Sequence, residues 1–103
     1  MMKTINLEEY TQGRISVLGT KVKGADIREQ LKLDEIDSMD ENVEIIVPDY
    51  IVTFTPSFFL GLFSKSLNTL GEDAFFQKYD FSKNRMIIQK QIIEGLDDWK
   101  SAR

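Results

Sequence analysis

The chain has 103 residues, of which 42% are hydrophobic and 29% are charged, and its formal net charge is −4. This length accommodates a single domain spanning residues 1–103, and the composition gives no sign of a disordered or membrane-embedded chain. Histidine and cysteine are both absent. Their absence excludes serine–histidine triads, thiol nucleophiles, disulfide bonds and zinc sites built from these side chains.

The N-terminal residues, MMKTINLEEY, reach polar and acidic side chains at once and lack the apolar core of a secretory signal. We therefore expect a cytoplasmic protein. The longest apolar stretch lies within residues 58–63, whereas a membrane-spanning helix needs about 20 apolar residues. A membrane is accordingly not expected among the partners.

Charge is segregated along the chain. Residues 14–32 carry five basic and two acidic side chains, whereas residues 33–64 carry seven acidic side chains and no basic one. Nucleic-acid-binding surfaces are usually densely basic, so DNA and RNA are not expected as partners. The acidic run fits a solvated connection between a helix and a strand better than a docking surface for a basic protein.

In the first half of the chain, alternation predicts a short strand at residues 4–7, which residues 15–17 extend or pair with. A helix is predicted from Gly24 to Leu33, since Ile27 and Leu31 lie four apart on one helical face. Residues 38–42 form a polar turn. The β-branched run at residues 43–47 is typical of a central strand covered on both faces.

Pro48 ends that strand, Asp49 and Tyr50 form a turn, and residues 51–54 return as extended chain. Thr55 and Pro56 then begin a helix, because threonine caps free amides and proline suits the first helical turn. The apolar residues of this helix span an arc of about 200°, twice the stripe needed to cover a core. We assign four of them to the core and three to an exposed patch. The core residues are Phe59, Phe63, Leu67 and Leu70, and the patch residues are Phe58, Leu60 and Leu62.

Gly71 ends that helix, a short helix follows at residues 72–78, and residues 79–81 form a brief strand. The last helix begins near Asn84. Its core stripe consists of Ile88, Ile92, Leu96 and Trp99, with Met86 and Ile93 flanking it. A hairpin through residues 82–88 is the alternative.

Motifs for chemistry are few. Gly19 and Gly24 have the separation of a phosphate loop, but Ala25 and Asp26 replace the lysine and hydroxyl residue that should follow. Acidic residues 34, 37 and 40 have a spacing of three, whereas calcium loops place ligands at every second residue. No metal and no cofactor are therefore expected. Ser57, at a helix start, suits either a first-turn role or phosphorylation.

From about Gly13 to Phe81 the chain resembles small STAS-like domains of bacteria and phages, a family of unknown function that is distantly similar to anti-sigma factor antagonists. The resemblance is carried by Gly24 and Arg28 four residues apart, a strand leading to Asp49, and Ser57-Phe58 followed by Phe59 and Phe63. It implies an α/β fold with a small mixed sheet of four or five strands and helices packed on it. It also implies a protein-interaction role opposite a signalling partner such as a kinase-like ATPase.

Two positions depart from the family pattern. Leu60 and Gly61 stand where members often have an acidic pair, and Phe58 stands where anti-sigma factor antagonists carry the phosphorylated serine. A phosphorylation switch of that kind is therefore not expected.

These observations predict a non-enzymatic, regulatory protein-binding module. The predicted interaction face consists of Asp49, Tyr50, Ser57, Phe58, Leu60 and Leu62, and the candidate basic contacts are Arg14 and Arg28. Self-association is left open. Two alternatives remain. One is a phage- or mobile-element-encoded inhibitor that masks a host protein, and the other is a small carboxylate-based or nucleotide-binding enzyme, which a pocket joining Arg14, Arg28 and Asp49 would favour.

Overall fold

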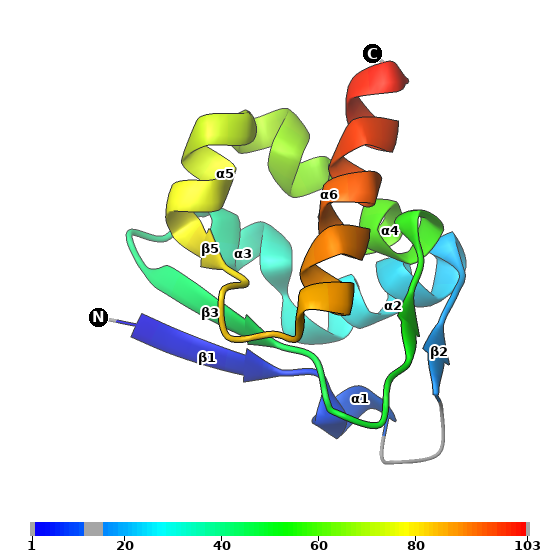
Figure 1. Ribbon diagram of the computed structural model, residues 1–103. Coiled ribbons are helices and arrows are strands. Elements are labelled where there is room, and N and C mark those ends of the chain that lie inside the picture. Colours follow the sequence, from blue (N-terminus) through cyan, green and yellow to red (C-terminus); the bar gives the residue numbers. More distant parts are fainter. Residues whose placement is uncertain (1, 12–15, 103) are drawn as a thin grey trace.

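Helices and short parallel strands are interspersed along the chain (Figure 1). The computed structural model describes residues 2–11 and 16–102, and within these ranges it contains six helices and five strands. In chain order they are β1 (Met2–Asn6), α1 (Glu8–Thr11), β2 (Val17–Leu18), α2 (Lys21–Leu31), α3 (Leu33–Ser38), β3 (Asn42–Ile46), β4 (Thr53–Phe54), α4 (Pro56–Leu70), α5 (Glu72–Lys78), β5 (Tyr79–Asp80) and α6 (Met86–Ser101). The predicted α/β class is confirmed.

The strands form two small sheets, one of order β1-β3-β5 and one made of β2 and β4. β3 is the central strand, as predicted, and its consecutive residues Val43, Glu44 and Ile45 are all buried. The expectation of a single mixed sheet is wrong, because every strand pair within the described residues is parallel. Each connection between paired strands contains a helix, and a crossover of this kind yields parallel neighbours.

The predicted pairing of residues 15–17 with the first strand is also wrong for the part that is described. Val17 lies opposite Thr53 of β4, and Ile15 lies outside the described residues. β2 and β4 each lead within two residues into a helix, α2 and α4 respectively. In Figure 1 this pair and the three-stranded sheet lie on either side of α6.

The helix predicted from Gly24 to Leu33 differs from the structure at both ends. It begins at Lys21, because the hydroxyl of Thr20 accepts a hydrogen bond from the Lys23 amide at 3.1 Å and caps the first turn. It ends at Leu31, because Lys32 adopts φ 57° and ψ 47° in the left-handed region. This residue divides the segment into α2 and α3, which changes the direction of the chain before the polar turn.

α4 begins and ends where the sequence indicated. Thr55 caps it by accepting a hydrogen bond from the Phe58 amide at 3.1 Å, and Gly71 at φ 82° ends it. The predicted helix at 72–78 is confirmed as α5, and the predicted brief strand is confirmed at residues 79–80.

The hairpin alternative at residues 82–88 is wrong, since α6 already begins at Met86. The Asn84 side chain makes the hydrogen bonds to β3 and Val47 that a neighbouring strand would otherwise make. Its side-chain amide donates to the carbonyl of Ile45 at 2.8 Å, and its carbonyl accepts from the amide of Val47 at 2.7 Å. These bonds satisfy the edge of β3 beyond the end of β5.

The core is one cluster that contains the inward stripe of α6 and most of the aromatic residues. α4 packs against both α2 and α6. Two glycines allow the close approach of α2: a Cβ on Gly24 would lie 2.3 Å from the Phe58 carbonyl oxygen, and one on Gly61 would lie 2.0 Å from the Lys21 carbonyl oxygen. α4, whose apolar residues span the arc of about 200°, is therefore covered on two sides, by α2 and by α6.

Candidate functional site

The predicted interaction face on α4 is wrong for two of its central residues. Phe58 and Leu62 are fully buried. The Phe58 ring packs edge-to-face on Phe54 with centroids 5.0 Å apart, and α2 crosses α4 at Gly61. From the sequence, only one face of α4 was expected to be covered. In the structure α2 covers a second face, where Gly24 and Gly61 meet.

The other members of the predicted face do not form a continuous apolar surface. Asp49 and Ser57 are exposed, Leu60 is half-buried against the core, and Tyr50 is half-buried with its hydroxyl hydrogen-bonded to Thr11. Arg14, the first candidate basic contact, lies outside the described residues.

Arg28, the second candidate basic contact, is buried inside the protein. Its guanidinium donates to Asp34 at 2.7 Å, to Asp37 at 2.8 Å, to the Leu62 carbonyl at 2.9 Å and to the Ser66 hydroxyl at 2.8 Å. It therefore joins α2, α3 and α4 within the protein. Gly24 precedes it by one helical turn on the same face, so the close helix contact brings Arg28 within reach of the α4 backbone.

Asp37 is the buried acceptor of this network. Besides Arg28 it accepts hydrogen bonds from the Ser66 hydroxyl at 2.6 Å and from the Tyr79 hydroxyl. Burial, together with the hydrogen bond to Asp37, raises the pKa of Tyr79 well above its usual range. Sequence reasoning missed the network because Ser66 and Tyr79 are distant in sequence and carry no motif.

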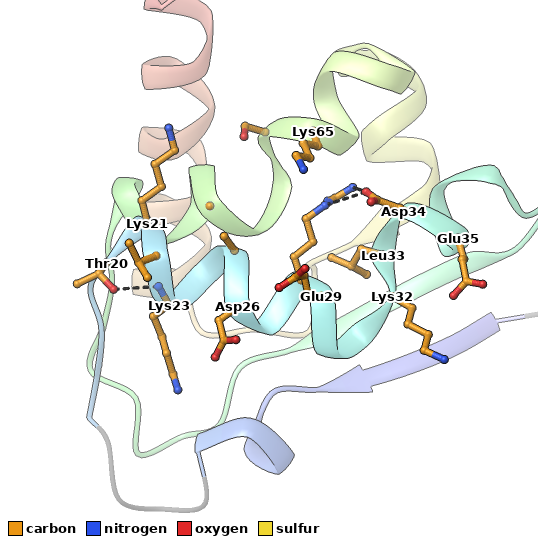
Figure 2. A pocket seen from close by; sticks show the side chains of 15 residues that line it. Thr20, Lys21, Lys23, Asp26, Glu29, Lys32, Leu33, Asp34, Glu35 and Lys65 are labelled. Atoms are coloured by element: carbon orange, nitrogen blue, oxygen red, sulfur yellow. Dashed lines mark hydrogen bonds and ion pairs between the residues drawn. The ribbon is translucent and has the colours of Figure 1, made fainter.

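A groove lies over this network between α2, the start of α3 and the polar face of α4, with a volume of about 970 Å³. Figure 2 shows charges of both signs around it. Besides Arg28, the basic residues are Lys21, Lys23, Lys32 and Lys65, and the acidic residues are Asp26, Glu29, Asp34 and Glu35. The hydrogen bond from Arg28, helped by its charge, lowers the pKa of Asp34.

The groove offers little chemistry of its own. The guanidinium at its floor is already bonded to two carboxylates, a carbonyl and a hydroxyl, so a bound anion would have to displace an existing partner. Arg28 lines the groove while Asp49 lies near Arg85, with 4.0 Å between the Asp49 carboxylate and Arg85 Nε. Arg28 and Asp49 are therefore not brought together in one pocket.

An exposed apolar surface lies on the outer face of α6. Met86, Ile87 and Ile93 are 82%, 47% and 51% exposed, and with Lys90 they border a hollow of about 510 Å³. We call Met86, Ile87, Lys90 and Ile93 the α6 strip. Residues 86, 90 and 93 share a face because helical neighbours recur at three and four positions. The sequence already contained a sign of this surface, since Met86 and Ile93 are apolar residues that lie beside the core stripe of α6.

The α6 strip adjoins the turn after β3. The Arg85 guanidinium donates to the carbonyl of Pro48 at 3.2 Å and also to the carbonyl of Ile51. These bonds hold the turn that carries the exposed Asp49 against the beginning of α6. Val52, in the same segment, is exposed as well. One residue of the predicted face, Asp49, therefore lies beside a different helix from the one expected.

Residues 2–11 and 16–102 contain no group of three or more carboxylates placed to hold a metal ion. Among the helices in the same ranges, none combines the length and the apolar character that crossing a bilayer requires.

Comparison with protein-family models, with curated proteins and with solved structures found no match to this chain.

Proposed function

We propose that this protein is a non-enzymatic interaction module that binds a protein partner through the α6 strip and the adjoining turn at Asp49. The observation that carries the proposal is the gathering of Met86, Ile87 and Ile93 on one exposed helix face. Apolar surface of this kind is stabilised when a partner removes it from water, by about 25 cal/mol per Å². Exposed apolar patches with polar residues at their rim are typical of protein-binding sites.

The partner class comes from the resemblance to STAS-like domains. It favours a cytoplasmic regulatory role toward a signalling protein such as a kinase-like ATPase. An enzymatic role has less support, since the chain lacks histidine and cysteine and the buried Arg28 is engaged in structural hydrogen bonds. No cofactor, metal or nucleic acid enters the proposed function.

Affinity capture with matched variants tests the proposal. The wild-type protein, Met86→Glu and Val22→Glu would each be immobilised and exposed to an extract of the cells in which the protein is native. Val22 is the matched control, because it is also a highly exposed apolar helix residue but lies on α2 beside the groove. Both substitutions replace exposed side chains, so both variants should melt within about 1 °C of the wild type.

We expect a protein that is retained by the wild type and by Val22→Glu but is lost with Met86→Glu. That protein would then be purified and the complex reconstituted, with ATP hydrolysis measured to test the partner class. Retention of the same proteins by all three would show that the α6 strip is not a binding surface. If only Val22→Glu failed to retain the protein, the groove and not the α6 strip would be the binding surface.

A further inference from the structure

We infer that the partner presents an acidic side chain between apolar ones to the α6 strip, and that the strip does not pair with a second copy of this chain. This inference rests on the proposed function and concerns the chemistry of the same surface. Its starting point is Lys90, which lies between Met86 and Ile93 along the strip.

Lys90 has no ion pair in the described part of the protein. The described salt bridges, all within 4.0 Å, involve other cations, and the other lysine of α6, Lys100, pairs with Glu72 at 3.0 Å. Glu94 follows Lys90 by one turn, but this order of base and acid is the weaker one in a helix. The strip therefore combines apolar side chains with a cation that has no carboxylate of its own.

Covering the strip would take the Lys90 ammonium group partly out of water. Removing a charge from water costs free energy unless an opposite charge or hydrogen-bond acceptors replace the lost hydration. A partner that buries Met86 and Ile93 therefore binds more tightly when it supplies an acceptor between them. A glutamate or aspartate with apolar neighbours three or four residues away on a helix has the matching spacing.

A second copy does not meet this requirement. In a symmetric dimer the two-fold axis passes through the middle of the shared patch, and Lys90 lies near the middle of residues 86–93. The two Lys90 side chains would then face each other, and like charges at close range oppose association. The charge of the strip thus favours a different protein over self-association.

A display library of amphipathic helical peptides tests the inference directly. Each peptide would carry apolar residues at a spacing of three and four around one randomised central position. Selection would be run on the wild type and on Lys90→Glu, and each selected clone would be checked for loss of binding to Met86→Glu. We expect aspartate and glutamate at the central position for the wild type, and lysine and arginine for Lys90→Glu.

Exchanging the acidic residue of one selected peptide for lysine should weaken binding to the wild type about tenfold or more, and Lys90→Glu should restore it. Sedimentation velocity should show a wild-type monomer, with self-association rising in Lys90→Met. Clones that need Met86 but show no charge preference would overturn the inference and leave the proposed function standing. A wild-type dimer that Met86→Glu dissociates would also overturn the inference. If no clone depended on Met86, both the inference and the proposed function would fail.

Discussion

Arg28 meets two aspartates of α3 that differ in burial. The Asp37 side chain is 4% exposed, whereas the Asp34 side chain is 75% exposed. A buried ion pair is costly to break, because removal of one partner leaves the other charge in the interior without compensation. An exposed carboxylate such as that of Asp34 contributes little to stability, since water can take its place beside the guanidinium. The two residues therefore form a natural comparison.

Asp37→Ala should lower the free energy of unfolding by about 3 to 5 kcal/mol, since it leaves Arg28 buried without its inner carboxylate. Asp34→Ala is the matched control, with the same arginine and the same substitution, and it should cost much less. Urea denaturation of both variants at pH 7 measures the difference. If both substitutions lowered the free energy of unfolding equally, the buried Asp37 carboxylate would stabilise the fold no more than the exposed Asp34 carboxylate does.

Tyr79 gives the network a pH dependence at alkaline pH. The folded protein favours the neutral phenol, and its pKa is raised by burial and by the hydrogen bond to Asp37. The unfolded phenol loses its proton near pH 10. Above about pH 10 the unfolded chain therefore binds fewer protons than the folded one, and rising pH lowers the stability of the fold.

Tyr79→Phe should cost about 1 to 3 kcal/mol at pH 7, because a buried carboxylate oxygen loses its hydrogen bond. The variant lacks the titrating group, so the stability gap between it and the wild type should narrow between pH 9 and pH 11. Urea midpoints for both proteins across this range test the prediction. A gap that stays constant with pH would contradict the raised pKa of Tyr79.

At the scale of elements, the crossing of α2 and α4 depends on two glycines. The missing Cβ atoms let backbone meet backbone, and neither site has a flexible side-chain end that could move aside. Phe58 and Leu62 are fully buried in the part of α4 that meets α2, and the same contact brings Arg28 to the Leu62 carbonyl. One helix crossing thus explains both the lost interaction face and the buried network.

Gly61→Ala should destabilise the protein by about 3 kcal/mol or more, although alanine favours an isolated helix by about 1 kcal/mol over glycine. The reason is that the new methyl group would lie 2.0 Å from the Lys21 carbonyl oxygen. Thr69→Ala, at an exposed site of the same helix, should melt at or slightly above the wild-type temperature. Thermal melts followed by circular dichroism compare them. A Gly61→Ala variant as stable as Thr69→Ala would show that the helices can separate at little cost.

At the scale of the whole molecule, one hydrophobic cluster connects both sheets. It contains Ile5 and Val43 of the larger sheet, Leu18 and Phe54 of the smaller one, and the inward stripe of α6. Backbone hydrogen bonds tie the smaller sheet to the start of α4, including one from the Thr55 amide to the Leu18 carbonyl at 2.9 Å. Two sheets that share a core are expected to lose it together.

Unfolding should therefore be a single transition. Trp99 fluorescence reports on the packing of α6, where its indole donates to Asn68 of α4 at 2.9 Å, and far-ultraviolet circular dichroism reports on all helices. The two probes should give the same urea midpoint. A Trp99 signal that changes at lower urea would indicate that α6 detaches before the rest unfolds.

Sequence by itself determined the elements whose signals are local. Thr55, Pro56 and Gly71 set the limits of α4, and the stripe at residues 88–99 set the inward face of α6. The β-branched run at 43–47 identified the central strand. Each of these signals acts within a few residues through capping, backbone dihedral preference or side-chain periodicity, so the chain shows them before it folds.

Tertiary structure alone decided which apolar residues are exposed. Phe58 is buried because its ring packs on Phe54 where α2 crosses α4, whereas Met86 at the start of α6 is 82% exposed, and the crossing itself needs glycines far apart in sequence. The same holds for Asn84, whose amide acts as a strand edge only because β5 ends early beside it. Burial and polar pairing are properties of the space between elements, and local residue preferences carry no information about that space.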